Sequence, residues 1–133
     1  MELIRANQVS KELLINFLQG NQNVNEDQLL DKGHVVVDND RLIGCFVLEE
    51  VEDNQIWLQQ LYVIKEEAMK LPILIEAILT LAKQQAAMTI YVNSHQLLVD
   101  IILESLQFRQ EAEGVLLNGI YRSTGKWWTY PIT

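Results

Sequence analysis

An apolar strand that leads through a short polar turn into an apolar helix constrains the fold of this chain more than any other feature. Residues 55–63 (QIWLQQLYV) have strand character, and residues 72–84 begin with a proline, which costs a helix nothing at its first position. Apolar side chains cover most of the circumference of this helix, so we expect it to be buried against a sheet. Strand character returns at residues 88–92. A strand–helix–strand unit of this length crosses over right-handedly, which predicts that its two strands are parallel.

The junction between this strand and this helix is the candidate site. Where a strand ends at a helix N-terminus, unpaired amide groups and the positive end of the helix dipole face the same point, and α/β proteins bind ligands there. The turn, residues 64–71 (IKEEAMKL), contains no glycine, so its backbone does not readily curl around a phosphate. We therefore expect a ligand site at this junction, and we expect phosphate binding there to be weak.

Further elements are predicted on both sides of this unit. They are a strand at 2–5, a helix at 11–19 capped by Ser10 and ended by Gly20, a helical turn at 26–31, a hairpin of 34–37 and 41–50 with its turn at 38–40, a helix at 96–106, strand character at 115–117 and 120–121, and a last strand at 126–132 after the turn 123–125. Gln59 and Gln60 break the apolar alternation of strand 55–63, as an inserted bulge residue would. The predicted fold is α/β (α+β), with a mixed, twisted sheet of six or seven strands and helices on both faces, in a single domain over residues 1–133.

Composition narrows the classes of partner. Eighteen acidic and ten basic residues give a net charge of −8, which repels nucleic-acid phosphate and anionic lipid. The chain opens Met-Glu without a secretory leader, and its longest apolar run, residues 71–82, is interrupted by Glu76 and is too short to span a bilayer. We expect a cytoplasmic protein that binds neither nucleic acid nor membrane.

Residues able to bind a metal or to act as a nucleophile are few and scattered. Cys45 lies inside the alternating run RLIGCFVL, which indicates a core or sheet residue rather than a reactive thiol. With only His34 and His95 beside it, no His/Cys cluster has metal-ligand spacing. We expect no bound metal.

The order of these elements resembles that of the GNAT superfamily of acetyl-CoA-dependent N-acyltransferases, over essentially the whole chain. Four local stretches support the resemblance. VVVDNDRLIGCFVL is similar to the family's second and third strands, with Gly44 at the usual small residue, and LYV is similar to the end of its fourth strand. ESLQF is similar to its helix-to-strand step, and EGVLLNGIYRSTGKW to the tails of many members.

The resemblance implies a binding site for acetyl-CoA. In the family the pantetheine arm pairs with exposed backbone at a bulge where the fourth and fifth strands splay apart, and the pyrophosphate meets the loop before the central helix. The positions that match this site are Leu61, Tyr62, Val63, Lys70, Leu71 and Asn93. The family's loop pattern of Gln or Arg, two residues, Gly, one residue, then Gly or Ala is replaced here by Ala68, Leu71 and Ile73. This replacement predicts an impaired or lost cofactor site.

The resemblance also implies a general acid that this chain lacks. The family's last helix often carries a tyrosine that protonates the leaving thiolate, and Leu103 stands at that position. The remaining candidates for acid or base catalysis are Glu49, His95 and Tyr121.

Three hypotheses for function follow. The first is an N-acyltransferase whose acceptor is a small-molecule or peptide amine, attracted by the acidic residues Glu49, Glu50, Glu52 and Asp53. The second is a non-catalytic GNAT-fold module that binds a small molecule, a peptide or a protein. The third is a homodimer interface formed by the aromatic residues Trp127, Trp128 and Tyr130. Strand alternation sends the two tryptophans to opposite faces, so we expect one in the core and the other exposed or covered by a second subunit.

Overall fold

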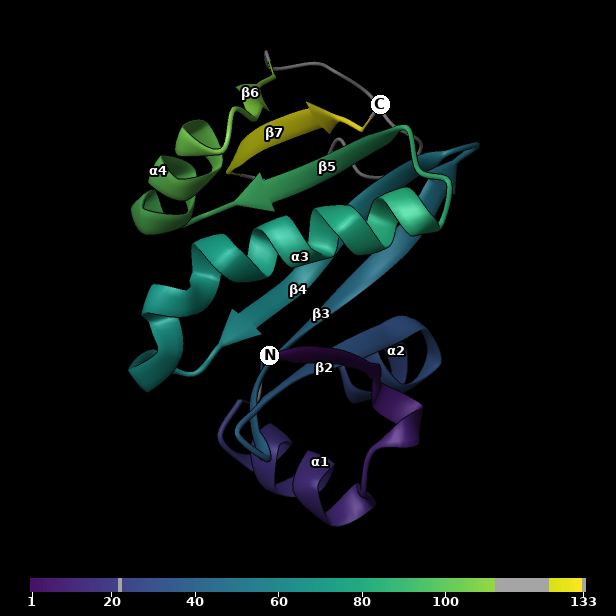
Figure 1. Ribbon diagram of the computed structural model, residues 1–133, viewed down its shortest axis with the longest axis vertical. Helices are drawn as coiled ribbons and strands as arrows, with labels where there is room; N and C mark the ends of the chain where they lie inside the picture. The colour runs from purple at the N-terminus through teal and green to yellow at the C-terminus, as the bar shows by residue number, and fades with distance from the viewer. Residues whose placement is uncertain (22, 112–124, 133) are drawn as a thin grey trace. The chain divides into compact units, whose positions relative to one another are not determined.

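The computed structural model describes residues 1–21, 23–111 and 125–132 of the chain. The predicted strand segments 115–117 and 120–121, most of the turn 123–125, and the catalytic candidate Tyr121 lie outside the described residues. The described elements, labelled in Figure 1, are β1 (Glu2–Arg5), the 3-10 helix η1 (Ala6–Gln8), α1 (Lys11–Gln19), α2 (Glu26–Lys32), β2 (Gly33–Asp38), β3 (Arg41–Glu52), β4 (Gln55–Val63), the 3-10 helix η2 (Lys65–Lys70), α3 (Leu71–Gln84), β5 (Thr89–Ser94), α4 (Leu97–Ser105), β6 (Arg109–Gln110) and β7 (Lys126–Pro131).

The strands form one mixed sheet in the order β1-β2-β3-β4-β5-β7-β6. Strand β4 pairs in parallel with β5, from Gln55 opposite Thr89 to Leu58 opposite Val92. The pairs β1–β2, β2–β3, β5–β7 and β6–β7 are antiparallel. The predicted fold class and the predicted parallel pairing across the central helix are therefore confirmed.

The chain divides into two compact units, and strands β3 and β4 each run from one into the other. Unit 1 comprises Met1–Leu48 and Gln59–Ala68, and unit 2 comprises Glu49–Leu58 and Met69–Thr133. The expectation of a single domain over residues 1–133 stays a prediction.

Unit 1 is built around a cluster of buried apolar side chains from η1, α1, α2, β2 and β3. Its members are Ala6, Leu14, Phe17, Leu29, Val35, Cys45 and Val47. The β2–β3 hairpin closes through Asn39 and Asp40, whose φ angles of 51° and 61° are the left-handed values expected of these residue types. Burial of one face of each helix against this cluster supplies most of the stability of such short helices.

Two predictions about the helices of unit 1 need correction. Ser10 precedes α1 as expected, but its side chain makes no capping hydrogen bond. The single turn predicted at residues 26–31 is a helix of seven residues, because Asn25 caps it by accepting a hydrogen bond from the backbone N–H of Gln28 at 3.0 Å. The segment between the cap at Asn25 and Gly33 is therefore a short helix and not a single turn.

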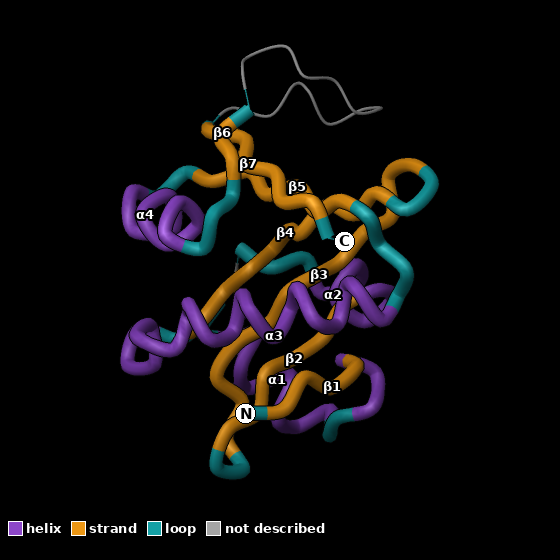
Figure 2. The backbone as a smooth tube through the Cα atoms, turned by 45° about the horizontal axis from the view of Figure 1, so that its top comes forward, coloured by secondary structure: helices purple, strands orange, loops and turns teal. Residues whose placement is uncertain are grey.

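In unit 2, β5 lies between β4 and β7, and α4 lies next to β5 and β6 (Figure 2). Helix α3 buries Leu71, Leu74, Ile75, Ile78 and Ala82, as its apolar pattern predicts. No described helix has both the length and the apolar character needed to cross a membrane.

The two tryptophans of β7 face opposite sides of the sheet, as strand alternation predicts. Trp128 is 5% exposed, and its indole N–H donates to Asp100 of α4 at 2.9 Å. Trp127 is half-buried and meets Trp57 of β4, with 5.8 Å between the ring centroids. The expectation that the second tryptophan is largely exposed or covered by another subunit is wrong, because a partner within the same chain covers part of it.

Candidate functional site

The second half of β4 carries the irregularity that the sequence predicts. Gln60 has a φ of 53°, which places its backbone in the left-handed region in the middle of a strand. A residue in this conformation interrupts the regular ladder, as a bulge does, and leaves nearby backbone groups without regular strand partners. The prediction of an irregular backbone at Gln59–Gln60 is confirmed.

Hydrogen bonds to the start of α2 hold this irregular residue in place. The side-chain Oε1 of Gln60 accepts from the backbone N–H of Asn25 at 2.6 Å, and its Nε2 donates to Oε1 of Gln28. The backbone carbonyl of Gln60 lies 3.6 Å from the thiol of Cys45. Since Asn25 is also the N-cap of α2, the beginning of that helix and the bulge of β4 are fixed by the same residues.

Past the bulge, β4 passes very close to β3. A Cβ atom added to Gly44 would lie 2.6 Å from the carbonyl oxygen of Tyr62, a distance at which backbone must move. The amide of Ile64 donates to the carbonyl of Ile43 at 2.8 Å. The small residue predicted at position 44 is thus required by the backbone of Tyr62.

The ring of Tyr62 points to α1 and borders a hollow on unit 1. It meets Phe17 edge to face, with 5.9 Å between centroids. The hollow has a volume of about 450 Å³, and the described residues that line it are Gln19, Gly20, Asn21, Asn23, Val24 and Tyr62. A second hollow of about 380 Å³ shares Gly20 and Asn21 with it and extends to Asp40 and Arg41.

Asn21 lines the first hollow and has a buried side-chain oxygen that no described residue satisfies. It is 8% exposed, and its Nδ2 donates to the carbonyl of Phe17 at 2.7 Å. Its buried Oδ1 has no hydrogen-bond partner among the described residues. A buried oxygen without a partner is costly, so an N–H donor placed in the hollow would be stabilised there. None of the described lining residues is charged, which favours a neutral donor such as an amide or an unprotonated amine.

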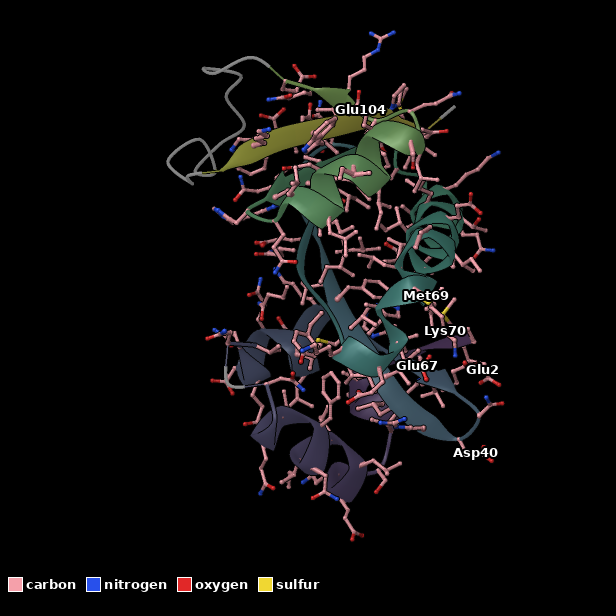
Figure 3. All side chains as sticks on the ribbon, turned by 90° about the vertical axis from the view of Figure 1, so that its left-hand side faces the viewer. Glu2, Asp40, Glu67, Met69, Lys70 and Glu104 are labelled. Atoms are coloured by element: carbon pink, nitrogen blue, oxygen red, sulfur yellow. The ribbon has the colours of Figure 1, made fainter. Side chains whose placement is uncertain are left out.

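The start of α3 differs from the expected open turn. Residues 65–70 form the 3-10 helix η2, which leads directly into α3, and Met69 and Lys70 lie at its end (Figure 3). A 3-10 helix uses the amides of its later residues in its own hydrogen bonds, so fewer donors remain before α3 than an open turn would leave. The prediction of a simple polar turn is therefore wrong in this respect.

Charge at η2 also opposes phosphate binding. Its first turn carries Glu66 and Glu67, and a carboxylate oxygen of Glu66 lies 3.9 Å from a guanidinium nitrogen of Arg41. Carboxylates at a helix N-terminus interact favourably with the dipole that would otherwise attract a phosphate. Lys70 precedes α3 with an ordinary right-handed backbone and no side-chain cap. We find no glycine and no left-handed residue between Lys65 and Leu71 that would turn amides toward an anion.

The six predicted cofactor-binding residues are divided between the two units. Leu61, Tyr62 and Val63 belong to unit 1, at the end of β4. In unit 2, Lys70 and Leu71 lie at the start of α3, and Asn93 lies in β5 opposite Trp127. A site formed by all six stays a prediction.

The catalytic candidates occupy different surroundings. Glu49 is half-buried in β3, and His95 is exposed directly after β5. Leu103, which stands where the family has its tyrosine, is completely buried in α4. Cys45 is buried, and burial raises the pKa of its thiol to about 12, so it is protonated at neutral pH. The interpretation of Cys45 as a structural residue is confirmed.

No group of three His, Cys, Asp or Glu side chains within the described part of the chain is arranged to hold a metal ion. The absence of a metal cofactor stays a prediction.

Two features of the site were not found from the sequence. Asn21 belongs to no sequence motif, and its position directly after the glycine that ends α1 is the one local signal it offers. Gln60 was identified as a bulge residue, but nothing in the sequence linked its side chain to residues 25 and 28, which lie over thirty positions away.

Comparison with known proteins gives no match by sequence and clear matches by structure. No protein-family model and no curated protein matches the sequence. A GNAT-family acetyltransferase from Staphylococcus aureus superposes with a TM-score of 0.76 over 99% of both chains, at 20% identity. A Bacillus subtilis acetyltransferase in complex with CoA gives a TM-score of 0.67 at 17% identity, over 96% of this chain and 95% of that one.

A third neighbour is longer. N-acetylglutamate synthase from Neisseria gonorrhoeae, in complex with coenzyme A and N-acetyl-glutamate, gives a TM-score of 0.73 at 14% identity. The match covers 99% of this chain and 35% of that one. Identities this low establish a shared fold, and they leave the activity of this chain to be inferred from its own residues.

Proposed function

We propose that this chain, which has the fold of the GNAT acetyltransferases, is an acyl-CoA-dependent N-acyltransferase with a weakened coenzyme A site. The observation that carries the proposal is the left-handed residue Gln60 in β4, on a fold shared with acetyltransferases that bind coenzyme A. A bulge at this strand offers backbone groups to an extended ligand such as pantetheine, and it needs no particular side chain at Leu61 or Val63.

The start of α3 is why we propose a weakened site. An open glycine-containing loop offers several amides to the pyrophosphate, and η2 offers fewer and adds Glu66 and Glu67. Each charge-assisted hydrogen bond contributes roughly 1.5–3 kcal/mol, so the loss of two weakens binding at least about a hundredfold. If an intact site binds in the micromolar range, this chain should have a dissociation constant for acetyl-CoA near 1 mM, to order of magnitude.

The proposed acceptor is an amine of a small molecule or a peptide. The hollow beside Tyr62 supports this choice, because the unpartnered Oδ1 of Asn21 would accept a hydrogen bond from the amine. A cytoplasmic location and the lack of nucleic-acid and membrane partners belong to the same proposal. Glu49 is the candidate general base, acting directly or through an ordered water.

A second candidate function is favoured by one specific observation. Leu103 is 0% exposed, so the position of the family's tyrosine is part of the apolar core and supplies no proton. A non-catalytic module that binds a small molecule, a peptide or a protein through the inherited fold would need no such acid.

Binding and turnover measurements test the proposal and separate the two candidates. At its own dissociation constant a ligand stabilises a fold by about 0.4 kcal/mol, so acetyl-CoA at 0.1 mM should leave the melting temperature nearly unchanged. An NMR titration to several millimolar should then shift resonances of Leu61–Val63. Saturation at tens of micromolar would contradict the weakened site, and no shift at any concentration would contradict coenzyme A binding altogether.

Turnover is assayed with acetyl-CoA at several millimolar and a panel of amines and peptides, with products detected by mass spectrometry. Acetylated product above the rate without protein supports the enzyme. Binding of acetyl-CoA without product across the panel supports the non-catalytic module.

A further inference from the structure

One face of the sheet in unit 2 gathers aromatic and acidic side chains. Register places Trp57 of β4, Tyr91 of β5 and Thr129 of β7 in one row across three strands. Side chains of paired residues point to the same face, and so do residues two apart along a strand. We call this surface the aromatic–carboxylate face. Its members, all half-buried, are Glu52, Gln55, Trp57, Tyr91, Glu111 and Trp127.

Two indole rings form its centre. Trp57 and Trp127 lie 5.8 Å apart between centroids, with their planes tilted by 48°. They come from the two strands on either side of β5, and Tyr91 of β5 lies in the same row as Trp57. Aromatic faces carry negative electrostatic potential, and a cation within about 6 Å of a ring centroid is attracted to it.

Carboxylates accompany the rings. Glu111 accepts a hydrogen bond from the hydroxyl of Thr129 at 2.8 Å, which holds it on this face. Burial, followed by the charges of Glu111 and Glu52, raises the pKa of Tyr91. Arg109 of β6 lies opposite Thr129 in the same row and is exposed.

A hydrogen-bond acceptor completes the set. The side-chain oxygen of Gln55 is buried and has no partner among the described residues, and the same holds for the indole N–H of Trp57. Gln55 lies two residues before Trp57 and therefore on the same face. An unpaired carbonyl oxygen beside carboxylates and π faces attracts an N–H donor that carries positive charge.

We propose that the aromatic–carboxylate face binds the protonated head of an alkylamine. The rings of Trp57 and Trp127 receive the cation and its first methylene groups, Glu111 and Glu52 supply the opposite charge, and Gln55 accepts one ammonium N–H. No carboxylate is among the described residues that line the hollow beside Tyr62, so a charged amine is better matched here. This inference concerns binding alone and does not depend on coenzyme A or on acyl transfer.

Charge complementarity selects this occupant over two others. A neutral apolar molecule would gain from the rings but would cover two carboxylates, which are costly to bury without a partner. A second copy of the chain, which also carries a net charge of −8, would be repelled by the same carboxylates.

The test is an NMR titration of the full chain with n-butylammonium chloride, read at the indole N–H resonances of Trp57, Trp127 and Trp128. Potassium chloride at equal ionic strength and the neutral 1-butanol are the reference titrations. We expect saturable shifts of Trp57 and Trp127 at millimolar butylammonium, with Trp128 nearly unmoved because it is buried on the opposite face beside Asp100. We expect 1-butanol to bind at least about fivefold more weakly, since it lacks the charge.

Two variants test whether Glu111 supplies negative charge to the bound ammonium group. Glu111→Gln keeps an oxygen that can accept from Thr129 and should weaken butylammonium binding about threefold to tenfold, the scale of one partly buried charge contact. Glu104→Gln, on the exposed surface of α4, is the matched control and should leave the dissociation constant unchanged. Equal binding of 1-butanol, equal effects of the two variants, or shifts of all three indoles would overturn the proposal. So would indole shifts that depend on protein concentration without ligand, because these would indicate a second copy on the face.

Discussion

The end of β4 and the start of α3 are the two regions proposed to contact coenzyme A, and their backbones differ in how well they suit such a ligand. The end of β4 keeps a left-handed residue at Gln60 and a close backbone approach at Gly44. The start of α3 replaces an open loop by the 3-10 helix η2, with two glutamates in its first turn. In the proposed site, the end of β4 would offer backbone groups to the pantetheine arm. The start of α3 would have to offer free amides and a positive electrostatic potential to the pyrophosphate.

The backbone at the end of β4 should tolerate side-chain substitution better than the phosphate-binding turn before α3 does. Backbone geometry at a bulge survives substitution of Leu61 or Val63, because any side chain leaves the same backbone groups in place. Phosphate binding depends on glycine for its backbone conformation and on the absence of acidic neighbours. Substitutions at residues 65–71 are therefore expected to weaken phosphate binding without changing the fold.

The largest effect is expected from Gly44→Ala. The added methyl group meets the carbonyl oxygen of Tyr62 at 2.6 Å, and the Cα of Val63 lies 3.5 Å away, so the variant should lose about 2–3 kcal/mol of unfolding free energy. Urea denaturation measures the loss. Gly20→Ala is the matched control, because its nearest contact is at an ordinary 3.7 Å and its φ is −84°, and it should stay within about 0.5 kcal/mol of the parent. Equal losses for both variants would contradict the close approach at Gly44.

Gln60→Leu should have the next largest effect. It removes the two side-chain hydrogen bonds to Asn25 and Gln28 and should cost about 1–2 kcal/mol, with altered amide shifts at the start of α2. Gln84→Leu, an exposed glutamine at the end of α3, is the control and should leave those shifts unchanged. If Gln60→Leu were as stable as the parent, the hydrogen bonds from Gln60 to Asn25 and Gln28 would make no net contribution to the free energy of unfolding.

A smaller, pH-dependent effect is expected from His34 of β2, which stacks on Phe46 at 5.1 Å between centroids. Burial, followed by the charge of Arg5, lowers the pKa of His34 in the folded state. The unfolded chain then binds more protons below about pH 6.5, so the stability is complete above that pH and is lost as the pH falls through the folded pKa.

Melting temperatures of the parent and of His34→Phe, measured between pH 7.5 and 5, check this expectation. The parent should lose more stability than the variant over this range, because the carboxylates titrate in both proteins and the imidazole only in the parent. Parallel curves would show that His34 does not carry the effect.

The smallest effect concerns the helix side of the comparison. Replacing both Glu66 and Glu67 by glutamine removes two carboxylates from the first turn of η2, and it should strengthen coenzyme A binding about threefold to tenfold, roughly 0.7–1.4 kcal/mol in total. An NMR titration with coenzyme A measures the change, and Glu12→Gln in α1 serves as the control. Unchanged affinity in the double variant would show that the backbone of η2, and not its charge, limits binding.

Much of this fold was determined by the sequence alone. The apolar circumference of residues 72–84 required a buried helix, and the right-handed crossover then required β4 and β5 to be parallel. Asn39 and Asp40 specified the hairpin turn, Gly44 the close approach of β3, and Gln59–Gln60 the irregular strand, since each of these depends on the conformational preferences of a few neighbouring residues.

Contacts between residues far apart in the sequence could be identified only from the tertiary structure. The partners of Gln60 lie over thirty positions away, and the contact between Trp57 and Trp127 spans seventy residues, so neither leaves a local pattern. The 3-10 helix at residues 65–70 was also missed, because six residues with no strong turn former fit an open turn equally well. Local preferences fix backbone conformation, and the contacts that build binding surfaces follow from the packing of strands and helices that the local sequence does not encode.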